Sequence, residues 1–162
     1  MSDIWVANAS PLIALATAGC LDLLERSCRE VLVPLPVVEE VLAGPPSDPA
    51  RQAIEAGWGH RVECSPAPLA IVEWGLGEGE TAVLALAVER KLTAVLDDAA
   101  ARTCAKAIGI RLIGTLGVVL RAKNKGIIYS AADVLRTVRD AGLYLDNDSI
   151  RAALKGVGEV WE

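Results

Sequence analysis

The sequence contains no phenylalanine, and aromatic residues make up only 4% of its 162 residues. This shortage argues against a protein that binds single-stranded nucleic acid on a platform of stacked aromatic side chains. Basic residues are also in the minority, because 16 Lys and Arg stand against 21 Asp and Glu, a net charge of −5 at pH 7. Such a balance excludes a protein that coats nucleic acid through an overall basic surface.

Cysteine and histidine are too sparse for a disulfide scaffold or a zinc centre. The four cysteines, Cys20, Cys28, Cys64 and Cys104, form no C-x-x-C pair. Reduced thiols in a cytoplasmic protein are therefore expected. His60 and Cys64 stand four residues apart, but a structural zinc ion needs two further ligands nearby. We expect no zinc site.

Long hydrophobic runs are missing too. No apolar stretch approaches the ~18 residues of a membrane span. Residues 11–21 are apolar, but a secretory signal begins with positive charge. Here Asp3 precedes the stretch and the first basic residue, Arg26, follows it. This segment is predicted to lie in a core, and no membrane association is expected.

What the sequence does contain is an alternation of short apolar runs and helical patterns. Apolar residues make up 52% of the chain, enough to bury a core. Strands are predicted over residues 4–7, 31–33, 62–65, 94–96 and 112–113. Helices are predicted over residues 11–18, 21–28, 34–42, 49–56, 80–90, 99–108, 116–125, 131–141 and 149–157. Buried strands separated by helices indicate a three-layer α/β/α sandwich with a central, mainly parallel sheet. One domain is expected to span residues 1–162.

Several polar residues have the spacing of helix caps. Ser10 and Asp148 are predicted N-caps, and Ser130 with Asp133 forms a predicted capping box. A glycine-rich loop is expected over residues 75–79, before the helix predicted at residues 80–90.

Acidic and polar residues follow the predicted strands. In an open parallel sheet, ligands bind beyond the carboxyl ends of the strands. The residues expected near that edge are Asn8, Ser10, Glu39, Glu40, Glu78, Glu80, Asp97 and Asp98. Each of them alone has an ordinary explanation as a cap, a helix-dipole partner or a solvated charge. Together, carboxylates that converge would raise one another's pKa, and a hard cation such as Mg²⁺ or Mn²⁺ would remove that cost. Such ions support phosphodiester cleavage.

Positive charge is concentrated in one segment. Residues 99–132 carry six Lys and Arg and no Asp or Glu, directly after Asp97 and Asp98. A basic segment beside an acidic, metal-binding centre is suited to holding a phosphate backbone. Arg102 and Lys106 are the candidate phosphate contacts.

Five segments, taken in order, resemble the PIN domain, and within it a bacterial and archaeal branch related to toxin ribonucleases. They are Val6-Ala7-Asn8-Ala9-Ser10-Pro11-Leu12-Ile13, Pro34-Leu35-Pro36-Val37-Val38-Glu39-Glu40-Val41, Leu76-Gly77-Glu78-Gly79-Glu80, Leu96-Asp97-Asp98 with Ala101-Arg102, and Gly114-Thr115-Leu116-Gly117. The resemblance covers about residues 4–126, which would form the core, with C-terminal helices over about residues 127–162. No single segment is specific, but the ordered set is.

The resemblance implies a Mg²⁺- or Mn²⁺-dependent ribonuclease, the toxin half of a toxin–antitoxin pair. The catalytic positions of the family fall on Asn8, Glu40, Glu80 and Asp97, and the metal would be held by Glu40, Glu80 and Asp97 or Asp98. Substrate contacts are expected from Ser10, Arg102, Lys106 and Thr115. The implied partners are RNA, a small cognate antitoxin protein and a second copy of the chain.

The sequence departs from the family pattern at Asn8, where the family places an acid. An amide oxygen can coordinate a metal, but it lacks the negative charge and cannot act as a base. The alternative hypothesis is therefore a catalytically weakened PIN-like module that binds RNA or a protein. A third hypothesis, a phosphoacceptor receiver domain, rests on the pair Asp97-Asp98, although in receivers the acid pair follows the first strand.

Overall fold

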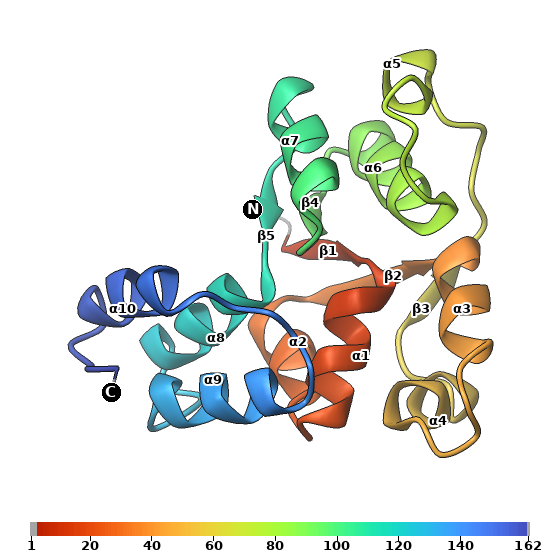
Figure 1. Cartoon of the computed structure of the whole chain (residues 1–162). Helices are drawn as coiled ribbons and strands as arrows, with labels where there is room; N and C mark the ends of the chain where they lie inside the picture. Colours follow the sequence, from red (N-terminus) through yellow and green to blue (C-terminus); the bar gives the residue numbers. More distant parts are fainter. Residues whose placement is uncertain (1–2, 162) are drawn as a thin grey trace.

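The computed structural model describes residues 3–161, and within them the chain forms one parallel sheet covered by helices (Figure 1). The five strands are β1 (Ile4–Ala7), β2 (Glu30–Pro34), β3 (His60–Val62), β4 (Thr93–Val95) and β5 (Leu112–Ile113). Their order in the sheet is β3-β2-β1-β4-β5, and all four pairings are parallel. The predicted sandwich with a parallel sheet is thereby confirmed.

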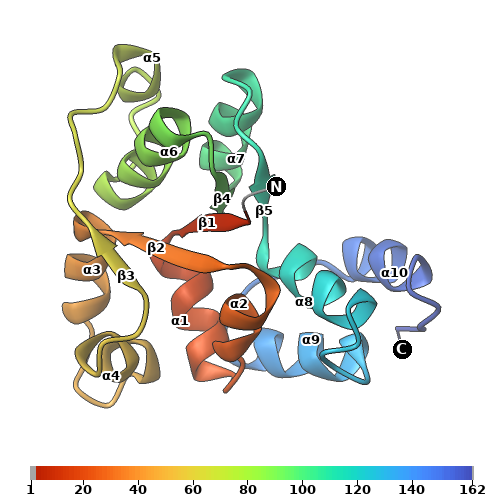
Figure 2. The ribbon, with the colours of Figure 1, turned by 180° about the vertical axis from the view of Figure 1, so that it is seen from behind.

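Helices connect successive strands and pack on both faces of the sheet (Figures 1 and 2). They are α1 (Ala9–Thr17), α2 (Asp22–Ser27), α3 (Leu35–Leu42), α4 (Pro49–Glu55), α5 (Leu69–Val72), α6 (Glu78–Arg90), α7 (Ala99–Ala107), α8 (Thr115–Asn124), α9 (Ala131–Asp140) and α10 (Asn147–Lys155). Helices α6 and α7 lie on one side of the sheet, and α1 and α2 lie on the other. Parallel strands require helical crossover connections of this kind, because a tight hairpin turn joins only antiparallel strands.

The strand order excludes a receiver domain. Receivers use the flavodoxin-like order 2-1-3-4-5, in which the acidic site follows the first strand. Here β1 lies between β2 and β4, and the pair Asp97-Asp98 follows β4.

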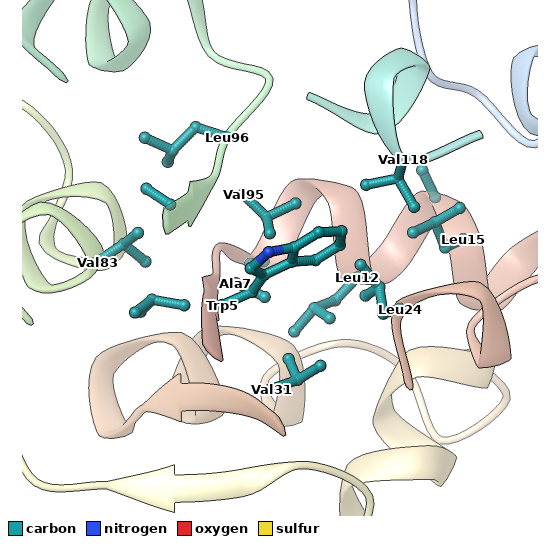
Figure 3. Packing of buried hydrophobic residues seen from close by; sticks show 14 of the residues in the cluster. Trp5, Ala7, Leu12, Leu15, Leu24, Val31, Val83, Val95, Leu96 and Val118 are labelled. Atoms are coloured by element: carbon teal, nitrogen blue, oxygen red, sulfur yellow. The ribbon is translucent and has the colours of Figure 1, made fainter. Parts of the chain in front are cut away.

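Trp5 on β1 is the aromatic centre of a core built mainly from Leu, Val and Ala. Its side chain is 3% exposed and is surrounded by Leu12, Leu24 and Val95 (Figure 3). Strand β1 lies in the middle of the sheet, with Trp5 paired to Val31 on β2 and to Thr93 on β4. A strand enclosed by neighbours on both edges and helices on both faces requires an almost continuous apolar sequence, and Ile-Trp-Val-Ala supplies it.

The start of α1, the position of β3 and the presence of helix α5 differ from prediction. Helix α1 begins at Ala9 with Asn8 at its N-cap, so the predicted cap at Ser10 is wrong. The main-chain N–H of Asn8 still bonds to the Val95 carbonyl, at 3.1 Å, and the chain then turns at once into the helix. Strand β3 ends at Val62, opposite Pro34, because the chain leaves β2 for α3 beyond that pair. The short helix α5 was not predicted, since four residues carry no detectable helical period.

The caps of the last two helices combine predicted and unpredicted contacts. Ser130 accepts a hydrogen bond from the Asp133 N–H at 3.1 Å, as predicted, but Asp133 pairs with Arg136 and closes no reciprocal bond. The carboxylate of Glu159 accepts the free N–H groups of α9 instead, at 2.9 and 3.0 Å. The predicted cap of the last helix is wrong, because Asp146, not Asp148, accepts from the Ser149 N–H.

Residues 157–161 fasten the C-terminal helices together. The indole of Trp161 is 6% exposed and donates to Asn147 Oδ1 at 3.0 Å. The guanidinium groups of Arg136 and Arg139 each lie 4.9 Å from the centroid of its ring. This closing segment therefore joins α9 to α10 through one buried aromatic side chain.

No helix within residues 3–161 combines the length and the apolar character needed to cross a membrane.

Replacing the buried indole should destabilise the protein markedly. We expect Trp161→Ala to lower the free energy of unfolding by about 3 kcal/mol, because it removes a large buried side chain and two cation–π contacts. Trp74→Ala is the matched control, since Trp74 is 40% exposed, and it should cost less than about 1 kcal/mol. Urea denaturation of both variants measures the difference, and equal losses would contradict a fastening role for Trp161.

Candidate active site

Asn8 lies at the carboxyl end of β1 with a buried amide oxygen. The residue is 2% exposed, and its Oδ1 has no hydrogen-bond partner within the described part of the chain. An unsatisfied buried acceptor costs about 1–3 kcal/mol. An oxygen held in this way is suited to a cation that enters the site.

Helix α6 approaches this oxygen closely because Gly79 has no side chain. A Cβ atom placed on Gly79 would lie 3.2 Å from Asn8 Oδ1 and 3.2 Å from Glu40 Oε1. Glu40 belongs to α3, which packs directly on α6. Asn8 Oδ1 and Glu40 Oε1 thus border the same space under the first turn of α6.

A second carboxylate stands close to Glu40. Burial raises the pKa of the Glu40 carboxyl, and the negative charge of Glu80 raises it further. Glu80 lies in the first turn of α6, and its Oε2 is 2.6 Å from the place of a Cβ on Gly77. Two partly solvated carboxylates and one buried amide oxygen therefore face the carboxyl edge of the sheet.

Asp97 follows β4 and is fixed by Thr115, which follows β5. The N–H of Thr115 donates to Oδ1 of Asp97 at 2.8 Å, and its hydroxyl donates to Oδ2 at 2.6 Å. Thr115 is fully buried, so this pair is anchored in the core. The role predicted for Thr115 was contact with substrate; the observed geometry makes it the residue that orients Asp97.

The two neighbouring acids are used differently. Asp98 is the N-cap of α7 and accepts from the Ala101 N–H at 2.9 Å. Asp97 instead lines a cavity at the sheet edge. Of the two metal ligands left open by the sequence, the geometry favours Asp97.

The predicted substrate contacts lie around this edge. Ser10, exposed in the first turn of α1, lines a cavity of about 260 Å³ together with Glu40. Arg102 donates from Nη1 to the Leu96 carbonyl at 2.9 Å, and a Cβ on Gly114 would lie between it and Asp97. Lys106 is exposed one turn further along α7.

The basic segment does not form one surface. Helix α8 starts at the carboxyl end of β5 and carries its later residues back toward the opposite edge of the sheet. There Arg121 pairs with Asp3, which precedes β1, and both Arg121 and Lys125 donate to the Ser27 carbonyl. Lys123 pairs with Glu159. These three charges hold helices together at the edge remote from the acids.

The donor atoms suit a hard divalent cation. Within residues 3–161, no three His, Cys, Asp or Glu side chains are grouped closely enough to hold a metal. The potential ligands are instead two carboxylates, Glu40 and Glu80, and the orphaned amide oxygen of Asn8. An all-oxygen set of this kind fits Mg²⁺ or Mn²⁺ and not zinc.

Gly79 was missed as a site residue from the sequence alone. The pattern Gly77-Glu78-Gly79-Glu80 was interpreted as a loop before the helix, whereas α6 already begins at Glu78. A glycine between two acids at a helix start is the available signal, because it permits close approach of another element.

A parallel sheet here carries acidic and amide oxygens near its carboxyl edge, where open sheets of this kind bind their ligands. A PIN-domain family model matches residues 4–159, and the chain belongs to the PIN-domain family. This family consists generally of nucleases that typically use divalent metal ions. The match includes the C-terminal helices, which the sequence resemblance had left outside the core. None of the curated proteins compared with the chain matches it.

Adding one methyl group at Gly79 should separate folding from metal binding. We expect Gly79→Ala to change the free energy of unfolding by less than about 1 kcal/mol, since the helix preference of alanine offsets a close contact with a buried oxygen. The same methyl group would press on Asn8 Oδ1 and Glu40 Oε1, so Mn²⁺ affinity should fall by about 10-fold or more. Calorimetric titration with Mn²⁺ and thermal unfolding check the two effects, and unchanged Mn²⁺ affinity would contradict this geometry.

Neutralising Glu40 should stabilise the protein without metal. The folded-state pKa of Glu40 is raised, so its ionised form weakens folding at neutral pH, and the penalty disappears as pH falls through that pKa. Because Glu40 is largely solvated, we expect Glu40→Gln to raise Tm by less than about 4 °C at pH 7 and to make no difference below about pH 4.

Glu39→Gln provides the matched control for this comparison, because Glu39 is an exposed neighbour on the same helix. Thermal unfolding in EDTA across pH 4–8 supplies the data. A lower Tm for Glu40→Gln at pH 7 would be inconsistent with the repulsion between Glu40 and Glu80.

Proposed function

We propose that the protein is a divalent-metal-dependent endoribonuclease. The observation that carries this proposal is the space beneath Gly79, which is bordered by the unpartnered oxygen of Asn8 and a carboxylate oxygen of Glu40. Buried oxygens normally have a partner, and here a cation coordinated by this oxygen would take that place. Membership of the PIN-domain family supports a nuclease reaction.

Glu40, Glu80 and Asn8 would hold the ion, with Asp97 at the adjoining strand end. When bound, Mg²⁺ or Mn²⁺ would polarise the scissile phosphate and lower the pKa of water. Without an acid at residue 8, the chain supplies one negative charge fewer than the family pattern. This predicts weak binding of either ion, because a neutral amide oxygen offers a hard cation less charge than a carboxylate does.

The residues of the chain have separate tasks in the proposed reaction. Glu40 and Glu80 would share the charge of the ion, which would relieve the repulsion that contributes to the raised pKa of the Glu40 carboxyl. Thr115 keeps the Asp97 carboxylate in one orientation through two hydrogen bonds. Arg102 retains guanidinium N–H groups beyond its bond to Leu96 and can donate them to a phosphate oxygen.

The biological setting belongs to the same proposal. The sequence resemblance to toxin ribonucleases supports a toxin held inactive by a small antitoxin protein, in the cytoplasm and as a homodimer. Ser10 and Lys106 are proposed to contact the RNA strand beside the site. The single hydrophobic cluster, which runs from Trp5 to Trp161, supports one domain over the chain.

RNA cleavage tests the proposal directly. We expect the protein to cut a single-stranded RNA in the presence of Mn²⁺, and Glu40→Gln, Glu80→Gln and Asp97→Asn each to lower kcat by about 100-fold or more. Gel analysis of an end-labelled RNA measures the rates. Glu39→Gln should cut at the wild-type rate, and a protein that cuts no RNA with Mn²⁺ or Mg²⁺ would refute the nuclease proposal.

Asn8 favours a second candidate, a PIN-like module that binds RNA or a protein and cleaves weakly or not at all. The substitution Asn8→Asp separates the two candidates, since it restores the charge that the family pattern includes. A rise in Mn²⁺-dependent cleavage would identify a weakened nuclease. Absence of cleavage in both forms, with salt-sensitive RNA binding, would identify the binding module.

A further inference from the structure

A cavity of about 430 Å³ adjoins the acidic site on the β5 side. It lies between the carboxyl end of β5, the first two turns of α8 and the segment from residue 144 to residue 149. Asp97 and Arg102 form one end of it, and Tyr144 forms part of another wall. The term Tyr144 cavity is used below for this space.

The lining of the Tyr144 cavity combines three kinds of group. Ile113, Leu116 and Leu120 are only partly buried and provide an apolar floor. Tyr144 is 85% exposed, so its ring is open to a ligand that enters the cavity from solvent. Arg102 supplies a cation beside Asp97. An apolar floor, an aromatic face and a guanidinium group are what a nucleotide needs for its base and its phosphate.

Two polar residues on the far wall bond to each other. Both carboxylate oxygens of Asp146 accept hydrogen bonds from Ser149, one from its N–H at 2.8 Å and one from its hydroxyl at 2.7 Å. The two donors of Ser149 are therefore used within the wall and are not free for the edge of a base.

The segment that carries Tyr144 passes between two cavities. It arches from the end of α9 to the start of α10 (Figure 1). On the other side of it, Leu143 helps to line the smaller cavity that contains Ser10 and Glu40. Each cavity thus includes one candidate acid of the site, Glu40 or Asp97, and a strand crossing the site would run along residues 141–146.

We propose that the Tyr144 cavity binds the base of a nucleotide next to the scissile phosphate, with Tyr144 stacked on the base and Arg102 on the adjoining phosphate. This inference rests on the proposed ribonuclease function and specifies where its substrate lies. Because stacking does not distinguish the four bases strongly, the cavity accepts any base with little sequence preference. The scarcity of aromatic residues makes Tyr144 a single stacking group and not part of a platform.

Binding of a fluorescein-labelled, 12-nucleotide single-stranded RNA in EDTA tests the assignment. Tyr144→Ala should weaken binding by about 5- to 100-fold, whereas Tyr144→Phe, which keeps the ring, should bind as the wild type does. Tyr129→Ala is the matched control, because Tyr129 is 94% exposed and stands beside Lys123 at the remote edge. Its affinity should be unchanged, and thermal unfolding confirms that all three variants are folded.

Abasic nucleotides placed one at a time along the same RNA locate the contact. In the wild type, one abasic position should weaken binding by the same factor as Tyr144→Ala. In Tyr144→Ala that position should cause no further loss, because two changes that remove one contact are not additive. Four RNAs that differ in the base at this position should bind within about 5-fold of one another.

The outcomes separate this inference from the nuclease proposal. Two results would overturn the base site. One is equal RNA affinity of the wild type and Tyr144→Ala, and the other is an abasic loss of affinity that adds in full to the loss caused by Tyr144→Ala. Either result would favour a protein partner for the cavity and would leave the nuclease proposal unaffected. A wild type that neither binds nor cuts RNA would overturn both.

Discussion

The site depends on the absence of one side chain, at the point where α6 passes over the carboxyl end of β1. Because Gly79 carries only hydrogen, the helix can pack against α3 and still leave Asn8 Oδ1 and Glu40 Oε1 bordering a common space. The same first turn brings Glu80 near Glu40, so close packing and charge repulsion arise together. A residue larger than glycine at position 79 would fill this space with its side chain, and that side chain would separate Asn8 Oδ1 from Glu40 Oε1.

Charge is distributed so that the two edges of the sheet have opposite tasks. At the carboxyl edge, burial and then the nearby charge of Glu80 raise the pKa of the Glu40 carboxyl. At the amino edge, Arg121 and Lys125 contact the Ser27 carbonyl and attach α8 to α2. Because α8 runs from the carboxyl edge of the sheet toward the amino edge, the positive charges of residues 99–132 fall into two separate groups. Whole-chain charge, and even segment charge, averages over these two environments.

Sequence patterns predicted the parallel sandwich because buried strands such as Ile4–Ala7 are almost wholly apolar, which few other environments permit. They also placed Asn8 and Asp97 directly after strands, whereas the resemblance to the PIN domain, and not the pattern, chose Glu40 over Glu39 and Glu80 over Glu78. They could not choose between Asp97 and Asp98, since the choice depends on Thr115 in the next strand's turn, 18 residues later. They placed Gly79 in a loop because glycine is more common in loops than inside helices, and its place between two acids was not used. In each of these cases the distinction depends on tertiary contacts, which local propensity does not describe.

The cap on α9 has a consequence for the order in which the C-terminal helices fold. The N–H groups of Ala131 and Ala132 are satisfied by Glu159, which lies 28 and 27 residues further along the chain. Until Glu159 reaches α9, the side chain of Ser130 is the cap at the start of that helix. Residues 141–146 connect α9 to α10, so the position of this segment depends on how both helices pack. A contact across 27 or 28 residues forms later than one within a helix, so this segment is expected to take its final position after α9 itself has formed.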